Sequence, residues 1–112
     1  MSVSNILNDT KKVLGLAEDY TPFDLDILLH LNSIAATLDQ LGVTDSKNLE
    51  ITKDTTWDQL FIVKEYNAQV RSYVYVKIRL LFDPPANSFL VTSLEKMVAE
   101  YEWRLNIAND ED

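Results

Sequence analysis

Residues 73–85 run Tyr-Val-Tyr-Val-Lys-Ile-Arg-Leu-Leu-Phe-Asp-Pro-Pro, and they carry two conflicting patterns. Between Val74 and Leu80, aliphatic side chains alternate with aromatic or basic ones, which is typical of a half-buried strand. The same residues also fit a helical spacing that begins at Tyr66, and no turn residue interrupts it. A strand needs a partner strand, and no other stretch of the chain offers a good one. The sequence therefore predicts a helix over about 66–82, which is apolar on nearly all sides over residues 73–82 and is therefore surrounded by partners.

A second long helix follows directly. Asp83-Pro84-Pro85 ends the first one, because the residue before a proline avoids helical dihedral angles and proline donates no hydrogen bond. Asn87 or Ser88 then caps a helix over about 88–107, which we expect to lie antiparallel to the first across the Pro-Pro turn. Residues 109–112, Asn-Asp-Glu-Asp, are expected to form a flexible acidic tail.

Three shorter helical segments precede this pair. The first spans about 4–14 and ends at Gly15, a left-handed cap residue. The second begins at Thr21-Pro22-Phe23-Asp24, where threonine caps, proline takes the first helical position and aspartate completes a capping box. It ends at Gly42 in the same way as the first. A further capping box, Thr56-Trp57-Asp58-Gln59, opens a short helix after a polar loop. These signals predict an all-α fold, a small bundle of about five helices.

The predicted core follows from apolar residues that recur every three or four positions. They form one seam along the second helix and another along the last. A chain of 112 residues fits one domain, 1–112, which buries roughly two-thirds of its unfolded surface. The predicted core residues are Ile27, Leu31, Ile34, Leu38, Leu41, Leu90, Leu94, Tyr101 and Leu105.

The charge of the chain disfavours nucleic-acid binding. The formal net charge is −8, from 18 acidic and 10 basic side chains. Such a surface repels a phosphate backbone, because affinity for nucleic acid is built mainly from lysine and arginine. Four basic residues nevertheless fall within 64–79, against one acidic residue. This basic band is either a solvated helix face or a contact for the acidic face of a neighbouring copy, and it comprises Lys64, Arg71, Lys77 and Arg79.

Recognisable catalytic, metal-binding and cofactor-binding motifs are missing from the sequence. The chain has no cysteine, which excludes disulfides and thiolate metal sites. Asp26 lies four residues from the one histidine, His30, but two ligands do not make a metal site, and a solvated histidine is the favoured interpretation. We therefore expect no enzyme, no cofactor and no metal. The first nine residues predict no signal peptide, and no apolar stretch approaches the length of a membrane span, so no membrane contact is expected.

Trp103 lies opposite the core stripe of the last helix. One interpretation is that a neighbouring helix of the same chain covers this second face. The other is an exposed apolar patch, which marks a partner site. We favour the partner site, because two apolar faces on each long helix exceed what a small monomer easily buries. The predicted interface consists of Trp103, Ile107, Phe89, Tyr75 and Phe82, together with the basic band.

Two stretches, 73–85 and Glu102-Trp103-Arg104-Leu105-Asn106, resemble the head–tail connector (adaptor) family of long-tailed bacteriophages. The helix over 24–42 and the helix start Thr55-Thr56-Trp57-Asp58 resemble it too, so the resemblance covers most of the chain. The sequence departs from the family at 60–68, where no glycine- and asparagine-rich break separates the short helix from the long one.

The resemblance implies an α-helical bundle that assembles as a dodecameric ring beneath the portal. Such a ring extends the DNA channel and docks the next neck, stopper or tail-completion protein. The implied partners are further copies of the chain, the portal protein and that downstream protein, while DNA passes without specific binding. The implied location is the neck of the virion, at the head–tail interface, after assembly in the host bacterial cytoplasm. An acidic protein suits such a channel, because it offers few cations to phosphates.

The main alternative is a non-viral helical regulatory or scaffolding protein. It would bind one partner through the Trp103 face, as a monomer or dimer. The two hypotheses differ in stoichiometry, because one predicts closed rings with the portal and the other small fixed complexes. A helix-turn-helix DNA binder is disfavoured by the charge, and an enzyme is the least favoured.

Overall fold

The computed structural model describes residues 5–44, 49–60, 62 and 66–110, with side chains as far as Asn106. Its elements, in chain order, are α1 (Ile6–Val13), α2 (Asp24–Leu41), the 3-10 helix η1 (Trp57–Leu60), α3 (Asn67–Phe82) and α4 (Ser88–Asp110). The described residues contain no strand, only an isolated bridge between Asn5 and Thr56. The all-α prediction is confirmed. None of the described helices is long and apolar enough to cross a membrane.

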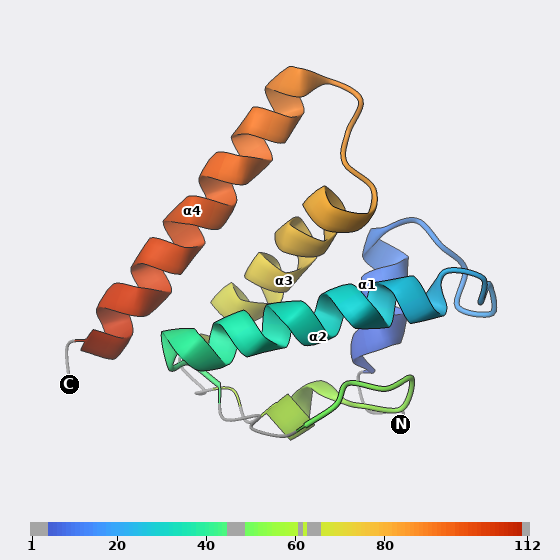
Figure 1. Cartoon of the computed structure of the whole chain (residues 1–112), viewed down its shortest axis with the longest axis horizontal. Coiled ribbons are helices and arrows are strands. Elements are labelled where there is room, and N and C mark those ends of the chain that lie inside the picture. Colours follow the sequence, from blue (N-terminus) through green and yellow to red (C-terminus); the bar gives the residue numbers. More distant parts are fainter. Residues whose placement is uncertain (1–4, 45–48, 61, 63–65, 111–112) are drawn as a thin grey trace.

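Residues 74–80, whose pattern fits both a strand and a helix, are helical, as predicted. They belong to α3, which lies at the centre of the molecule. It contacts α1, α2 and α4 (Figure 1). Val70, Tyr73 and Ile78 are completely buried on it. The Tyr73 hydroxyl donates a hydrogen bond of 2.7 Å to Glu102 on α4. Burial, and then this hydrogen bond, raise the pKa of Tyr73 well above its usual value, so the phenol keeps its proton and the bond to α4.

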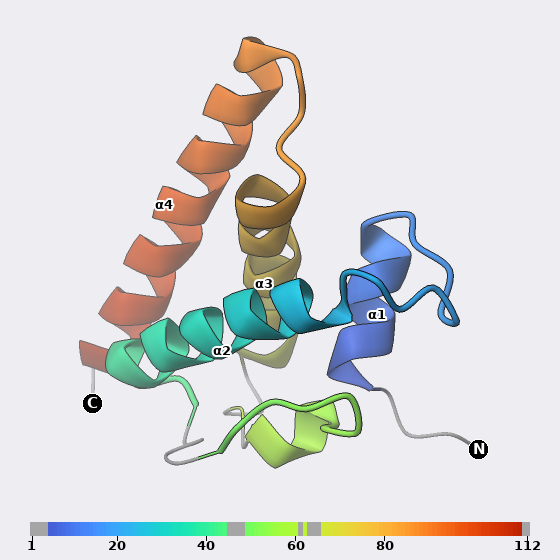
Figure 2. The ribbon, with the colours of Figure 1, turned by 45° about the vertical axis from the view of Figure 1, so that its right-hand side comes forward.

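The turn after α3 sets the start of α4. The Asp83 N–H donates to the Arg79 carbonyl at 3.1 Å, and Arg79 Nε donates to the Asp83 carbonyl at 2.9 Å. Asn87 is the cap of α4, since its side-chain oxygen accepts from the N–H groups of Phe89 and Leu90. The two long helices are antiparallel, and α4 begins beyond the end of α3 (Figures 1 and 2).

The last helix is longer than predicted. Asn109 and Asp110, expected in a flexible tail, belong to α4, whereas Glu111 and Asp112 lie outside the described residues. The tail prediction is therefore wrong for its first two residues. The helix continues past the last apolar residue of its core-facing side.

Both glycines end helices as predicted. Gly15 and Gly42 have φ angles of 80° and 81°, the left-handed region that favours glycine. The N–H of the following residue reaches back five positions in each case, from Leu16 to Lys11 at 2.8 Å and from Val43 to Leu38 at 3.4 Å. These are Schellman-type ends, which satisfy carbonyls that the helix leaves free.

The predicted start of α2 is wrong. The helix begins at Asp24 rather than at Pro22, and Phe23 at its cap position makes no side-chain capping bond. Thr21 contributes only its carbonyl, which accepts from the Asp24 N–H at 3.1 Å. The Asp24 carboxylate, which the capping box would direct back to the start of the helix, instead meets α1: its Oδ1 lies 2.9 Å from the Lys11 ammonium.

Lys11 is the least expected member of the core. The sequence places it in the last turn of the first helix, where cations complement the helix dipole. In the structure its side chain is only 1% exposed, and Nζ also donates to the Glu18 carbonyl at 2.9 Å. A buried ammonium requires such partners, because removal from water is costly. The ion pair with Asp24 therefore ties α1 to the start of α2.

Hydrogen bonds connect the segment around Ile51 and Trp57 to α1 and α2. Trp57 is buried, and its indole N–H donates to Asp9 at 2.8 Å. Asn32 on α2 makes two hydrogen bonds with the backbone of Ile51. The N–H of Thr56 donates to the Gln59 side chain at 2.8 Å, which is the reverse half of the predicted capping box.

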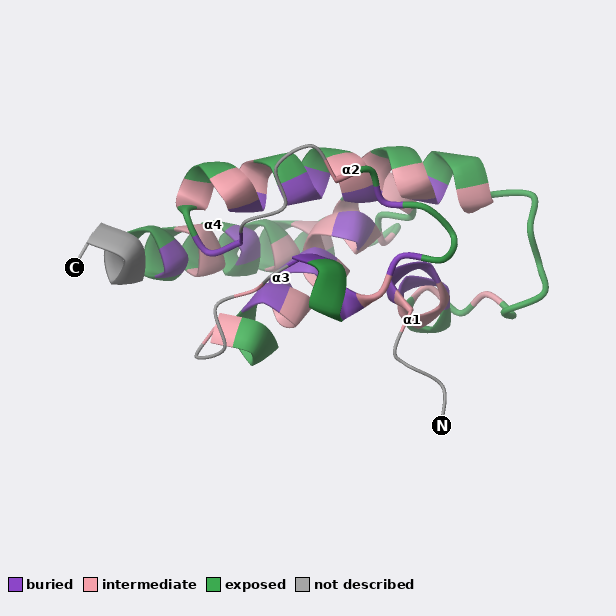
Figure 3. Cartoon of the chain, turned by 90° about the horizontal axis from the view of Figure 1, so that it is seen from below, coloured by how far each residue is buried: buried purple, intermediate pink, exposed green. Residues whose placement is uncertain are grey.

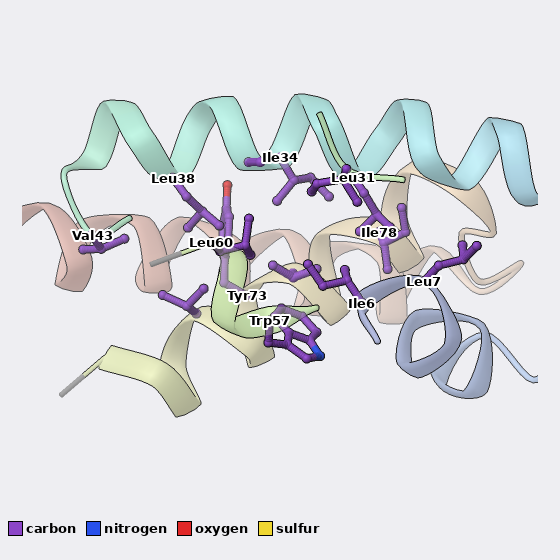
Figure 4. Packing of buried hydrophobic residues seen from close by; sticks show 14 of the residues in the cluster. Ile6, Leu7, Leu31, Ile34, Leu38, Val43, Trp57, Leu60, Tyr73 and Ile78 are labelled. Carbon is purple, nitrogen blue, oxygen red and sulfur yellow. The ribbon is translucent and has the colours of Figure 1, made fainter. Parts of the chain in front are cut away.

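The core lies where α2, α3, η1 and α1 meet (Figure 4). Of the predicted core residues, the structure buries Ile27, Leu31, Ile34, Leu38 and Leu105, and it packs Leu41 and Tyr101 half-buried against them. Leu94 is half-buried, and Leu90 is 54% exposed. The core prediction for Leu90 is wrong, because the first turns of α4 extend beyond α3 and have little beside them. Figure 3 shows the exposed residues along this helix.

We expect Leu31→Ala to lower the free energy of unfolding by about 2–5 kcal/mol, because it empties a buried leucine site. Leu94→Ala should cost clearly less, because its side chain is only half-buried. Denaturant melts of the two variants check this. Equal losses would mean that α4 packs more tightly than described.

Removing Asp24 should destabilise the fold more than removing Lys11. Asp24→Ala leaves a buried ammonium with only the Glu18 carbonyl, at a cost of roughly 3 kcal/mol. Lys11→Met keeps the volume of the stem and leaves the Asp24 side chain, whose Oδ1 is buried but which is 25% exposed as a whole, so water can hydrate the carboxylate in part. Thermal melts of the two variants and of the double variant measure the difference. A larger loss for Lys11→Met would contradict the assignment.

Candidate functional site

The outward side of α4 carries large apolar side chains. Trp103 is 63% exposed and Phe89 is 82% exposed, on the side opposite the buried Val98 and Leu105. No helix of the same chain covers these two rings, among the residues that the structure describes. Both side chains lie on one face, 14 positions and therefore about 21 Å apart along the axis. We name the exposed residues Phe89, Lys96, Ala99 and Trp103 the outer face of α4. The side chain of Ile107, expected beside them, lies outside the described residues.

One flank of α4 adds further apolar surface. Leu90 and Met97 are 54% and 40% exposed. Met97 also lines a shallow hollow of about 100 Å³ together with Glu100, Tyr101 and Arg104. The ion pair between Arg104 and Glu100 is solvent-exposed, so it contributes little to stability. The exposed apolar surface of α4 therefore extends beyond the outer face to this flank.

Tyr75 and Phe82, predicted as interface residues, are both half-buried in contacts within the subunit. The Tyr75 ring packs edge-on against Trp57 with centroids 5.9 Å apart, and Phe82 packs against Phe23 at 5.4 Å. Burial, and then the nearby Asp9 carboxylate, raise the pKa of Tyr75, while Arg71 acts in the opposite direction. The structure thus places these two rings in the subunit's own packing rather than beside Trp103.

The basic band is also partly used within the subunit. The Arg71 guanidinium lies over Trp57, 4.8 Å from the ring centroid, a cation–π arrangement. Arg79 binds the carbonyl of Asp83 at the end of α3. Lys77 is half-buried, and Lys64 lies outside the described residues. The two arginines therefore have a role in the fold whether or not they meet another copy.

Sequence reasoning missed the outward side of α2. Leu25 and Leu29 are 71% and 63% exposed, and Ala36 is exposed on the same side. We name these three residues the outer face of α2. The sequence signal was present, because Leu25 and Leu29 are four residues apart and lie off the seam of Ile27 and Leu31.

A groove lies where the end of α1, the start of α2 and the end of α3 meet. It has a volume of about 540 Å³, and we name it the corner groove. Its floor is apolar, and its polar members include His30, which is half-buried rather than fully solvated. The described residues contain no group of three or more histidine, cysteine, aspartate or glutamate side chains placed to hold a metal ion. The groove is lined by Leu14, Leu16, Phe23, Asp26, His30, Leu81, Phe82 and Asp83.

The structure is thus that of a small subunit with exposed apolar side chains on α2 and α4 and a groove at one corner. A comparison with family models finds a match over residues 6–112, nearly the whole chain, to the family described as phage connector protein. No curated protein and no solved structure matches the chain. The matched range includes all the elements described above, from α1 to α4. The chain belongs to the phage connector protein family.

Proposed function

We propose that this chain is a head–tail connector, or adaptor, which assembles as a ring beneath the portal of a long-tailed phage. In this proposal the ring, dodecameric as the family resemblance implies, extends the DNA channel and docks the next neck or tail-completion protein. Membership of the connector family makes the chain a structural phage protein that contacts other head or tail proteins. The ring, the portal contact and the channel are the proposed refinements.

The observation that carries the proposal is the outer face of α4. Phe89 and Trp103 are large aromatic side chains left in solvent on a helix whose opposite side is held by Val98 and Leu105. Aromatic residues, including phenylalanine and tryptophan, are enriched where proteins meet. These observations support a contact of Trp103 with another subunit or with the portal.

A head-to-tail ring also requires two different surfaces on each subunit. The outer face of α2 supplies a second exposed apolar surface, built from Leu25, Leu29 and Ala36 on a separate helix. The net charge of −8 supports the channel function, because a ring with few free cations lets phosphates slide past without binding.

Electron microscopy of the purified chain, alone and mixed with portal protein, tests the proposal. We expect closed rings seated on the portal, with a stoichiometry that native mass spectrometry can count. A chain that stays monomeric and does not bind the portal protein would overturn the proposal. A small complex of fixed stoichiometry with a different protein would support the regulatory or scaffolding alternative.

We expect Trp103→Ala to leave the melting temperature of the isolated subunit almost unchanged and to weaken assembly. Truncation of a buried interface tryptophan often costs over about 2 kcal/mol, which is roughly a 30-fold loss of affinity. Melting temperature and ring formation should be measured on the same protein. The matched control is Trp57→Ala, since Trp57 is only 2% exposed and its loss should lower the melting temperature strongly. A strong drop in stability for Trp103→Ala would refute the interface assignment.

A further inference from the structure

The corner groove has the composition of a docking site. Its apolar floor includes Leu81, which is 43% exposed, and Phe23, which is 40% exposed. Two carboxylates, Asp26 and Asp83, lie among its polar members. The lining of the groove, within the part of the chain that the structure describes, contains no lysine or arginine. Lys11 pairs with Asp24, and Arg79 binds the Asp83 carbonyl. An occupant should therefore bring apolar side chains and positive charge.

The start of α4 offers both of these properties. Phe89 and Leu90 are 82% and 54% exposed, and we name Ser88, Phe89 and Leu90 the tip of α4. Residues 88–94 contain no charged side chain, so the first turn has no acid to neutralise the helix dipole. The N-terminus of a helix carries a partial positive charge, which carboxylates stabilise. The tip thus combines exposed apolar side chains with the partial positive charge of a helix N-terminus.

The tip does not fill the groove of its own chain. The chain leaves the groove at Asp83 and passes through Pro84-Pro85, and α4 then starts on the far side of the turn, away from the start of α2 (Figures 1 and 2). The high exposure of Phe89 and Leu90 agrees with this placement. The occupant must therefore come from another molecule, and a second copy carries a matching tip.

We propose that the tip of α4 of one copy docks in the corner groove of the next copy. The inference rests on the proposed ring and adds one contact between neighbouring copies to the surfaces proposed above. Tip and groove are different surfaces of one subunit, so the contact is heterologous and continues from copy to copy until it closes. Trp103 lies about 21 Å further along α4, on a part of the helix that this contact leaves free.

Disulfide trapping tests this contact, because the chain contains no cysteine of its own. The double variant Ser88→Cys with Asp26→Cys places one thiol at the tip and one at the rim, and both positions are exposed. Under oxidising conditions that allow assembly, we expect a ladder of linked oligomers on a non-reducing gel. A mixture of the two single variants should give linked dimers and nothing larger. The matched control, Ser88→Cys with Gln40→Cys, moves the second thiol to the exposed far end of α2 and should give no ladder.

Leu81→Glu provides an independent measurement, because it adds a carboxylate to a groove that is already acidic. We expect at least a tenfold loss of self-association, with circular dichroism and melting temperature unchanged. If this variant forms normal rings and loses only portal binding, the portal occupies the groove and the inference is wrong. Wild-type rings without cross-links in the double variant would also refute it, while leaving the proposed function intact. A wild-type chain that forms no rings would overturn both.

Discussion

The fold depends on the burial of α3 against three other helices at once. Val70, Tyr73 and Ile78 have no exposed surface, and they face α1, α2 and α4 from the centre of the molecule. The hydrogen bond from Tyr73 to Glu102 then fixes α4 along its neighbour. Residues 73–82 of this helix are apolar on nearly all sides, as a helix with neighbours on several sides requires. The exposed large apolar side chain of α3, Leu81, lies at its end and lines the corner groove.

Much of the helical framework could be predicted from local signals. The prolines after Asp83, the glycines at positions 15 and 42 and the capping box at Thr56 each act within a few residues, so the sequence displays them directly. The ion pair between Lys11 and Asp24 could not be predicted, because it joins two helices whose packing the sequence does not show. It also engages the carboxylate that the expected capping box before α2 would use.

The candidate site was likewise predictable in part. The exposure of Phe89 and Trp103 could be anticipated, because a helical wheel alone places them opposite the core stripe. The wheel also placed Leu90 near the core, since it says nothing of where along α4 the neighbouring helix ends. The corner groove could not be predicted, because the residues around Leu14 and Phe23 build it together with the distant end of α3 at Leu81.

The uninterrupted length of α4 has a mechanical consequence. Its 23 residues make a rod of about 34 Å, with no proline or glycine to bend it. Phe89 near its start therefore stands at the end of a stiff arm, which is held where Val98 and Leu105 pack against the body and where Glu102 binds Tyr73. Trp103 belongs to this held part, because it lies between Val98 and Leu105 in the sequence. A force applied at the tip by an adjoining molecule is thus carried along the free turns of the helix to the packed part that bears the tryptophan.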